Sequence, residues 1–418
     1  MKKNIFPRKI LLLSSVPPCS NYSGGLALQQ LCRFLPKGNI VNFVIINKKL
    51  IPKIPPDLKW LPTQYSERPY EGWSNLPFLS LILSLVGETY IKIFVIRKIS
   101  KDIIEFGKKH QVNCLWVILE GQTLIRLALP IAKKLKIPLI TQIWDPPEWP
   151  LRDQHVDQLS KWLILKQFKV TLRQSWICAT TSFPMAEQYA RDFQTKTTPF
   201  LPSLDPKLAF PSAVKINSQK ELIIAVAGQL YSKKEWNTLI KALDNIHWQF
   251  GKRQVKIRLL GNWFKLEDIY SQVNIEYLGW RTQEETVKIM SQSDILYCPY
   301  WFDKAYEKEA QLSFPSKLTT YLASGRPVFF HGPKYSAPGK FLEKNQAALL
   351  CSTLEIKKMI KMLKRLVADQ KYYARLAKNG RQAFDKYLTS QTLHQNFAEF
   401  LGVEEKELIK KKVEKLNI

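Results

Sequence analysis

Residues 313–333 read SFPSKLTTYLASGRPVFFHGP and combine one helix and one strand in a short stretch. Ser316 stands directly before a helical pattern, Lys317–Ala323, and is predicted to be its N-cap. Gly325 ends this helix, and the apolar strand Pro327–Phe330 follows. A helix that leads through a tight turn into a buried strand is the repeating unit of parallel α/β sheets.

The same alternation continues through the C-terminal half of the chain. The other strands predicted there are Leu222–Ala227, Lys256–Leu260, Ile275–Leu278, Asp294–Cys298 and Ala348–Cys351. The other helices predicted there lie near Asn237–Asn245, Gln283–Ser291 and Glu355–Lys364. This half is therefore predicted to be one doubly wound domain.

The N-terminal half repeats the pattern. Its predicted strands are Ile10–Ser14, Val41–Ile46, Cys114–Leu119, Leu139–Ile143 and Trp176–Thr180, with helices near Leu26–Leu35, Leu124–Leu135 and Gln154–Leu172. A proline-rich stretch at 198–211 separates the two halves. We expect an N-terminal domain over residues 1–200, a C-terminal domain over 201–385, and a charged helical segment over 386–418 that could pack back on the first domain.

Composition narrows the class of protein. The chain has 418 residues, 45% of them hydrophobic, which is enough to bury two or three cores and excludes a disordered chain. The six Cys residues are scattered singly without a CxxC pair, so neither a zinc ribbon nor a disulfide framework is expected. These features favour a reduced, cytoplasmic protein.

The composition is unusual in its net charge of +28, and the excess of basic residues is spread over both halves of the chain. Residues 1–200 hold 28 basic and 13 acidic side chains, and residues 201–418 hold 35 and 22. A globally basic surface suits either nucleic acid or an anionic membrane. The sequence has no RNA-recognition, KH or helix-turn-helix signature, so nucleic acid is not an expected partner, and nucleic-acid binding remains the weakest alternative.

An apolar run beside a basic helix favours the membrane. The run Leu76–Val86 is too short to span a bilayer, which needs about 20 residues. The helical pattern Ile91–Lys109 follows it and carries six Lys and Arg side chains. An apolar patch next to cations is what in-plane contact with anionic headgroups requires, whereas the plainer alternative is a core helix with a solvated basic face. We expect peripheral association with the inner face of the plasma membrane.

In each half of the chain, a glycine-containing loop follows the first strand. In the first, Gly24 and Gly25 allow a ligand to approach the backbone just before a helix begins. In the second, Gly228 ends a strand, and Lys233 and Lys234 stand where a helix begins. Two ammonium groups at the positive end of a helix dipole suggest a bound polyanion, although a plain βα turn and a solvated Lys pair are the alternatives.

Together with these loops, the order of motifs along the chain resembles that of the GT-B glycosyltransferases, and among them glycosyltransferase family 4. The similarity is carried by SGG, AGQLYSKKEW, YLGW, SDILYCPY and, most specifically, FPSKLTTYLASGRPV. It implies two Rossmann-like doubly wound domains facing across a cleft. It also implies an enzyme that moves a sugar from a nucleotide-diphosphate donor with retention of configuration, here to a lipid-linked or saccharide acceptor.

The resemblance assigns a role to each matching residue. Gly24 and Gly25 match the glycine loop that faces the donor diphosphate and the acceptor. Asp145, in TQIWDPPEW, matches an Asp at a strand end beside the sugar. The other reading of Asp145 is a turn cap, because Asp-Pro-Pro is a strong turn signal.

The donor-binding residues that the resemblance implies all lie in the second half. Gly228 and Lys234 match the loop that pairs with the diphosphate, and Trp280 stands where the backbone meets the base. The remaining members match the helix start that caps the β-phosphate; they are Ser316, Lys317 and Leu318. His331 could line this site or be a hydrogen-bonded core residue, and the core reading is favoured.

Four positions depart from the family pattern. Its two Glu residues, eight apart, are replaced by Leu312 and Thr320, although Thr320 can still bond a ribose oxygen and Glu309 could substitute for the first Glu. Gln229 replaces a diphosphate-binding Arg, and Trp144 replaces a His. These changes keep open the alternative of a catalytically degenerate scaffold subunit.

Mechanistically, the sequence offers no obvious nucleophile, so the implied route is a front-face substitution in which the leaving phosphate takes the acceptor proton. A double displacement would need two carboxylates about 5–5.5 Å apart, and Asp145 with Glu148 or Glu120 would be the pair. There is no Asp-X-Asp pair for a divalent cation. We therefore expect no metal and no cofactor beyond the nucleotide-sugar, which is a co-substrate.

Overall fold

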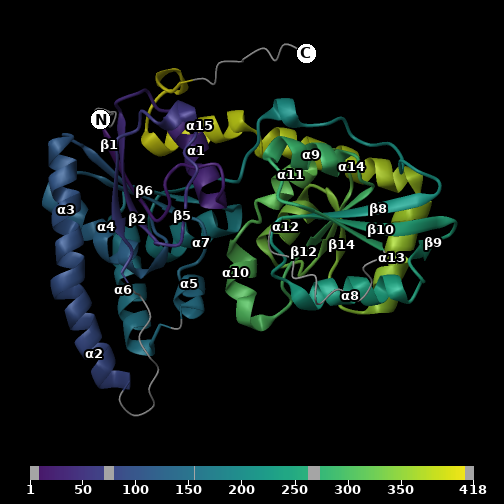
Figure 1. Cartoon of the computed structure of the whole chain (residues 1–418), viewed down its shortest axis with the longest axis horizontal. Coiled ribbons are helices and arrows are strands. Elements are labelled where there is room, and N and C mark those ends of the chain that lie inside the picture. The colour runs from purple at the N-terminus through teal and green to yellow at the C-terminus, as the bar shows by residue number, and fades with distance from the viewer. Residues whose placement is uncertain (1–8, 70–79, 155, 262–273, 410–418) are drawn as a thin grey trace. The chain divides into compact units, whose positions relative to one another are not determined.

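The computed structural model describes residues 9–69, 80–154, 156–261 and 274–409. It divides into two compact units (Figure 1). Unit 1 comprises 1–200 and 394–418, and unit 2 comprises 201–393. The N-terminal part of the apolar run Leu76–Val86 lies outside the described residues.

Unit 1 is built on a parallel sheet with the strand order β3-β2-β1-β4-β5-β6-β7. The strands are β1 (Ile10–Ser14), β2 (Ile40–Ile46), β3 (Thr63–Glu67), β4 (Cys114–Ile118), β5 (Leu139–Ile143), β6 (Ile177–Thr180) and β7 (Thr197–Pro199). The helices are α1 (Ser23–Arg33), α2 (Ser80–Tyr90), the π-helix η2 (Ile91–Val95), α3 (Ile96–Lys109), α4 (Gly121–Leu135), α5 (Glu148–Asp153), α6 (Gln158–Gln174) and α7 (Phe183–Phe193). The chain order reverses between β1 and β4, so this is the switch point where ligands bind in such sheets.

Unit 2 repeats the design with the order β11-β10-β8-β12-β13-β14. These strands are parallel, and a short β9 (Gln249–Phe250) pairs antiparallel with β10. The strands are β8 (Glu221–Ala227), β10 (Arg253–Leu260), β11 (Ile275–Gly279), β12 (Ile295–Pro299), β13 (Val328–His331) and β14 (Ala348–Cys351). The helices are α8 (Lys233–Asp244), α9 (Gln283–Ser291), α10 (Glu307–Leu312), α11 (Lys317–Ala323), α12 (Ala337–Lys344), α13 (Ile356–Ala368) and α14 (Gln370–Tyr387). The helix α15 (Ser390–Leu401) begins in this unit. The switch point here lies between β8 and β12.

The central strands of both sheets are largely apolar, because helices cover both faces of each sheet there. All five residues of β1 are buried, as are all five of β12. The predicted α/β fold with two doubly wound domains is therefore confirmed.

The last helix crosses the division between the units, and its residues from His394 onward belong to unit 1. Phe397 and Phe400 lie against Trp116 of β4, with ring centroids 5.5 and 6.1 Å away. Phe200 contacts the same two rings at 6.0 and 5.0 Å. Three of these four ring pairs are edge-to-face, and such contacts add to the apolar burial that stabilises the position of a terminal helix.

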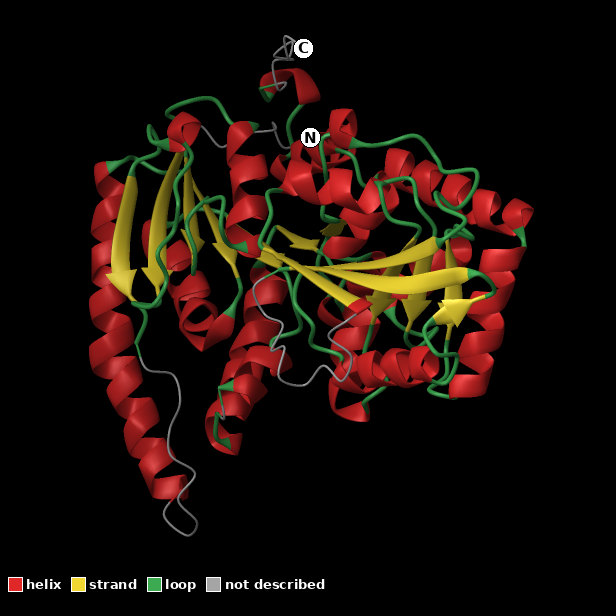
Figure 2. Cartoon of the chain, turned by 45° about the vertical axis from the view of Figure 1, so that its right-hand side comes forward, coloured by secondary structure: helices red, strands yellow, loops and turns green. Residues whose placement is uncertain are grey.

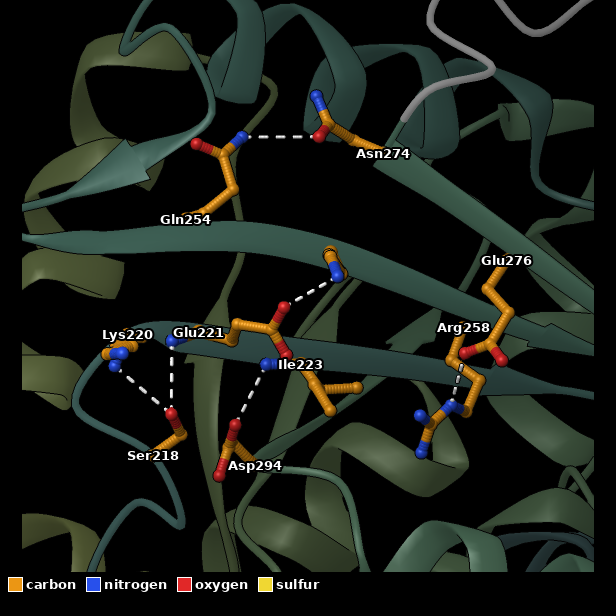
Figure 3. A network of polar contacts seen from close by, with 10 residues as sticks. Ser218, Lys220, Glu221, Ile223, Gln254, Arg258, Asn274, Glu276 and Asp294 are labelled. Carbon is orange, nitrogen blue, oxygen red and sulfur yellow. Dashed lines mark hydrogen bonds and ion pairs between the residues drawn. The ribbon is translucent and has the colours of Figure 1, made fainter.

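Polar contacts fasten the amino ends of the second sheet's strands (Figure 3). Asp294, just before β12, accepts bonds from the backbone N–H groups of Ile223 and Asn217, both at 2.8 Å. Burial raises the pKa of Asp294, and these two hydrogen bonds lower it in part. Because these strand ends lie opposite the carboxyl ends, Asp294 has a structural role rather than a place in the ligand site.

Some boundaries differ from the sequence-based prediction. The helix predicted from Leu26 begins at Ser23, so Gly24 and Gly25 lie in its first turn rather than before it. Ser316 occupies the N-cap position of α11, as predicted, but its side chain makes no hydrogen bond to a backbone N–H group there. Its backbone is already helical there (φ −57°, ψ −29°), whereas a capping Ser has an extended backbone.

Candidate functional site

The β8–α8 loop of unit 2 is shaped by glycine. Gly228 has φ +83°, a conformation that residues with a Cβ rarely adopt. Gly261, after β10, has φ +135°, and a Cβ there would lie 2.9 Å from the carbonyl oxygen of Gly228. The backbones after β8 and β10 therefore lie too close together for a side chain at Gly261.

Hydrogen bonds join these strand ends into a continuous edge. The N–H of Gly228 donates to the carbonyl of Leu260 at 2.8 Å, and the N–H of Gly261 donates to that of Gly279 at 2.9 Å. Trp280 follows directly and is 51% exposed. This places the predicted base-side residue on the same edge as the predicted diphosphate loop.

Lys317 is the cation of this edge. Its Nζ donates to the carbonyl of Gln229 at 2.9 Å and lies 4.7 Å from the centroid of the Tyr231 ring. Burial lowers its pKa to about 8. Gly228, Gln229 and Lys317, predicted from separate motifs, are thus brought together, and a Cβ on Gly228 would meet the Cε of Lys317 at 3.7 Å.

Tyr321 holds the helix that carries Lys317 at the switch point. Its hydroxyl accepts a hydrogen bond from the N–H of Ala227 at 2.7 Å and donates to the carbonyl of Tyr297 at 3.2 Å. Ala227 ends β8 and Tyr297 lies in β12, so one side chain connects both central strands. Leu318 is fully buried and packs in the core, which leaves only its backbone for a ligand.

The start of α8 carries a second cation. Lys234 is exposed, and its Nζ pairs with the Oδ2 of Asp303 at 3.1 Å. Ser232, which precedes the helix, is 1% exposed, and its Oγ has no hydrogen-bond partner within the described chain. An unsatisfied buried hydroxyl beside a helix N-terminus suits a ligand with acceptor oxygens.

Glu235 and His331 are buried and make hydrogen bonds within the core of unit 2. The Oε1 of buried Glu235 accepts from the N–H of Phe302 at 2.8 Å, and burial raises the pKa of this carboxyl group. His331 is fully buried, 2.8 Å from the Tyr297 hydroxyl and 2.9 Å from the carbonyl of Thr353. Burial lowers the pKa of His331 to about 4, so the favoured core reading agrees with its surroundings.

The positions that depart from the family pattern lie on two neighbouring short helices. Leu312 and Glu309 are both buried on α10, with 2% and 1% exposure. Thr320 lies half-buried on α11. Leu312 therefore supplies packing where the resemblance implies a carboxylate.

In unit 1, the glycines of α1 lie against two other loops. A Cβ on Gly24 would come within 2.6 Å of the Trp144 ring, and one on Gly25 within 2.2 Å of the Cys19 Sγ. The Trp144 carbonyl also accepts a hydrogen bond from Thr181 at 2.7 Å. The ends of β1, β5 and β6 are thus packed into one surface.

Asp145 lies on this surface, two residues after β5 and beside Trp144. Its carboxylate and that of Glu148 are near buried Tyr189, whose pKa is raised by burial and then by these charges. Ser15 donates a hydrogen bond to the Oε2 of Glu120 at the β1–β4 switch point. Asp145 and Glu120 therefore both end strands at the ligand-binding edge of unit 1.

Several of these residues were not predicted from the sequence. They are Ser15, Tyr231, Ser232, Gly261 and Asp303. Gly261 could have been recognised from the sequence, because it directly follows the end of an apolar strand, in LLGNW. The others are placed by contacts between residues distant in the sequence, such as the contact of Lys234 with Asp303, which lies 69 positions further along the chain.

The described residues contain no group of three or more His, Cys, Asp and Glu side chains placed to hold a metal ion. Within the same ranges, no helix is long and apolar enough to cross a membrane. All six cysteines are buried and free.

Solved structures with the same fold extend over almost the whole chain. HepE of Anabaena, solved in complex with UDP, is 15% identical with a TM-score of 0.64, and the match covers 94% of this chain and 99% of that one. Sucrose-phosphate synthase of Thermosynechococcus elongatus is 14% identical with a TM-score of 0.65, covering 92% and 96%. The lipopolysaccharide outer core galactosyltransferase WaaB is 12% identical with a TM-score of 0.60, covering 94% and 99%. No curated protein matches the sequence.

A family model agrees with these structures. Residues 211–383, most of unit 2, match the family described as Glycosyl transferases group 1. This range contains Gly228, Lys234 and Lys317, and it confirms the resemblance inferred from the FPSK…YLASGRPV segment. The chain is therefore a glycosyltransferase of the GT-B fold, and its residues 211–383 match the glycosyl transferases group 1 family.

Proposed function

We propose that this enzyme moves a sugar from a nucleoside-diphosphate donor, with retention of configuration, to a saccharide or lipid-linked acceptor. The reaction would take place at the cytoplasmic face of the membrane, in the synthesis of a polysaccharide or glycoconjugate. HepE was solved with UDP. UDP is therefore the first nucleotide to test.

The observation that carries this proposal is the cationic edge at the β8–β12 switch point. Lys317 lies over Gly228 with its ammonium group turned to the loop backbone. The buried Ser232 hydroxyl and the amino end of the twelve-residue helix α8 add hydrogen-bond donors. A diphosphate matches these groups in charge and in acceptor number.

The same groups would drive the transfer. As the bond from the anomeric carbon to the phosphate oxygen breaks, negative charge grows on the diphosphate, and Lys317 and Lys234 stabilise it. The acceptor hydroxyl oxygen bonds to the anomeric carbon on the same face, and its proton passes to the leaving phosphate oxygen. With two lysines and backbone amides balancing the charge, no divalent cation is required by this proposal.

Unit 1 would bind the acceptor. Gly24 lies against Trp144, and Asp145 follows, so an aromatic ring and a carboxylate occupy one surface at the strand ends. Such a pair suits a sugar, whose apolar face stacks on the ring while its hydroxyl groups bond to the carboxylate. Asp145 would thus orient the acceptor or the transferred sugar.

The test begins with calorimetric titration of UDP, UMP, UDP-glucose and UDP-galactose. The proposal expects UDP to bind at least tenfold more tightly than UMP, because the second phosphate meets Lys317. Asp145→Asn should leave UDP affinity unchanged and lower turnover with the accepted donor about 100-fold. Proton NMR of the anomeric signal in the first product then tests retention. Equal affinity for UDP and UMP contradicts the diphosphate site.

A scaffold subunit without catalysis is the second candidate, and buried Leu312 favours it. An apolar side chain with 2% exposure has replaced the carboxylate that the resemblance implies. The two candidates differ in turnover rather than in binding. A scaffold would bind UDP or nothing, yet would show neither donor hydrolysis nor transfer with any donor and lipid acceptor supplied.

A further inference from the structure

The segment from α2 through η2 exposes a continuous apolar stripe. Its members are spaced three and four residues apart on one helix face, and each is 45–62% exposed; they are Ile82, Leu85, Val86, Tyr90, Ile93 and Phe94. Isolated exposed apolar residues are ordinary, but six at helical spacing form a surface. Packing among the described residues of unit 1 does not explain this stripe.

The opposite face of the same helix is firmly attached to unit 1. Arg126 of α4 makes two bonds to the carboxylate of Glu88, at 2.7 and 2.5 Å, and both side chains are largely buried. Gln122 adds a third bond to Arg126 at 3.2 Å. Ile91 of η2 and Ile96, Ile99 and Ile103 of α3 are buried on this side. The stripe therefore faces away from unit 1, because the opposite face of its helix is bonded to and packed against unit 1.

Basic side chains flank the stripe. Lys92, Arg97, Lys98 and Lys101 are all exposed on η2 and α3. Glu88 is paired with Arg126, and the Nζ of Lys101 lies 3.9 Å from the Oε1 of Glu105. The stripe is thus apolar in its middle and cationic at its end toward α3.

The neighbouring helix α6 continues the same surface chemistry. It contacts α2, and it carries Trp162, which is 57% exposed, with the Nζ of Lys166 5.1 Å from the ring centroid. Trp and Lys together are the residues that anchor proteins at the headgroup level of a bilayer. A second helix therefore presents the same combination of apolar ring and cation.

The stripe lies on the side of unit 1 where the acceptor surface is built. β3 ends at Glu67 before α2 begins, and α3 ends before the start of β4, so α2 stands at the carboxyl ends of the strands. Figure 2 shows the strand arrows of this sheet pointing toward the end of the long helix that projects past them. Trp144 and Asp145 follow the carboxyl end of β5.

We propose that the stripe inserts into the interface of an anionic bilayer and that the acceptor hydroxyl belongs to a lipid-anchored molecule. This inference rests on the proposed function, since it names the acceptor class of that site. Burial of the stripe removes six apolar side chains from water, and the flanking cations pair with anionic headgroups. A bilayer bound there holds its lipid-linked hydroxyls on the side of the sheet where Asp145 lies.

Vesicle flotation tests the surface independently of turnover. The full chain should float with phosphatidylcholine vesicles containing 30% phosphatidylglycerol, and at least tenfold less with phosphatidylcholine alone. The double variant Val86→Asp/Phe94→Asp should lose binding at least tenfold, whereas Val214→Asp, an equally exposed apolar site in unit 2, should float like the parent. Lys92→Glu/Lys98→Glu should also lose binding, whereas Lys361→Glu/Lys364→Glu, the same charge change on α13, should have a much smaller effect.

Folding and the donor site serve as separate readouts. Each variant should keep the parent's melting temperature and UDP affinity, because UDP is proposed to bind unit 2. Flotation of the Val86→Asp/Phe94→Asp variant at the parent's level overturns the inference, as does failure of the parent to float. A stripe that instead joins two copies of the chain would give a dimer that Val86→Asp/Phe94→Asp disperses, which also overturns it. Failure of UDP to bind, with flotation intact, contradicts the proposed function and leaves the membrane surface standing.

For the acceptor class, a lipid-linked saccharide supplied in vesicles should be glycosylated at least tenfold faster than the same saccharide free in solution. The Val86→Asp/Phe94→Asp variant should lose this advantage while keeping the rate on the free saccharide. Equal rates on both forms in the parent overturn the lipid-anchored acceptor.

Discussion

The glycine loops after β1 and β8 occupy matching places in the two sheets, yet their glycines are there for different reasons. In unit 1 the space beside Gly25 is already full, because Sγ of Cys19 stands 2.2 Å from where a Cβ would be and two carbonyl oxygens stand at 3.0 Å. In unit 2 the space beside Gly228 is open, and the nearest atom is the Cε of Lys317 at 3.7 Å.

The difference separates a packing glycine from a binding glycine. A position without room for a methyl group requires glycine for packing. A position with a positive φ, open space and a neighbouring ammonium group leaves room for an anion. Substitutions at the two loops should therefore affect different properties, stability in unit 1 and nucleotide affinity in unit 2.

Gly25→Ala should have the largest effect, lowering the free energy of unfolding of unit 1 by about 3 kcal/mol, because the new methyl group overpacks a closed site. Urea unfolding followed by tryptophan fluorescence measures it. The matched control is Gly38→Ala, where φ is +90° but nothing lies within 4 Å, so only backbone strain of about 1 kcal/mol is added. Equal losses in the two variants would show that the contacts around Gly25 yield readily.

Lys317→Met should weaken UDP binding by about 2 kcal/mol, since charge-assisted hydrogen bonds are worth about 1.5–3 kcal/mol. The pH dependence follows from the pKa of about 8. The parent's affinity for UDP should fall between pH 7 and pH 9 as the ammonium group deprotonates. Lys317→Arg keeps its charge throughout this range and should flatten the profile.

Stability should change with pH in the opposite direction. The pKa of Lys317 is lower in the folded chain than the ordinary 10.5, so the unfolded chain binds more protons between about pH 8 and pH 10.5. The contribution of Lys317 to stability therefore rises with pH across this window. A parent enzyme whose UDP affinity is constant from pH 7 to pH 9 would contradict a role for the Lys317 charge.

The fold was predictable because its central strands are unmistakable. Ile10–Ser14 and Leu139–Ile143 were assigned with their observed boundaries, since strands covered on both faces form short, largely apolar runs. β3 (TQYSE) and β7 (TTP) were not identified, because edge strands are short and polar and carry no such run.

The candidate site was only partly predictable. Glycines and lysines at strand ends could be recognised, because local motifs place them. The bond between Ser15 and Glu120, 105 residues apart, and that between Lys317 and the carbonyl of Gln229, 88 apart, depend on strand order. Ser316 shows the opposite case, in which a strong local capping signal yields to a backbone that is already helical.

Gly228→Ala should have a smaller effect on two properties at once. The positive φ should cost about 1 kcal/mol of stability, and the methyl group beside Lys317 should lower UDP affinity about fivefold. Gly251→Ala provides the control in the same unit, because φ is +64° and nothing lies within 4 Å. It should lose the same stability and keep its UDP affinity, as measured by urea unfolding and calorimetry. Unchanged affinity in Gly228→Ala would remove this loop from the donor site.

Lys234→Ala should have the smallest effect, about a threefold loss of UDP affinity. The Lys234 side chain is 69% exposed and already paired with Asp303, and exposed ion pairs contribute only about 0.2–1 kcal/mol. Asp303→Ala sharpens the test, because removing the competing carboxylate frees Lys234 and should tighten UDP binding about twofold at low salt. Lys233→Ala removes a neighbouring exposed charge and should change affinity by less than Lys234→Ala does. A loss for Lys234→Ala as large as that for Lys317→Met would mean that the exposed lysine leaves Asp303 when the donor arrives and binds the diphosphate directly.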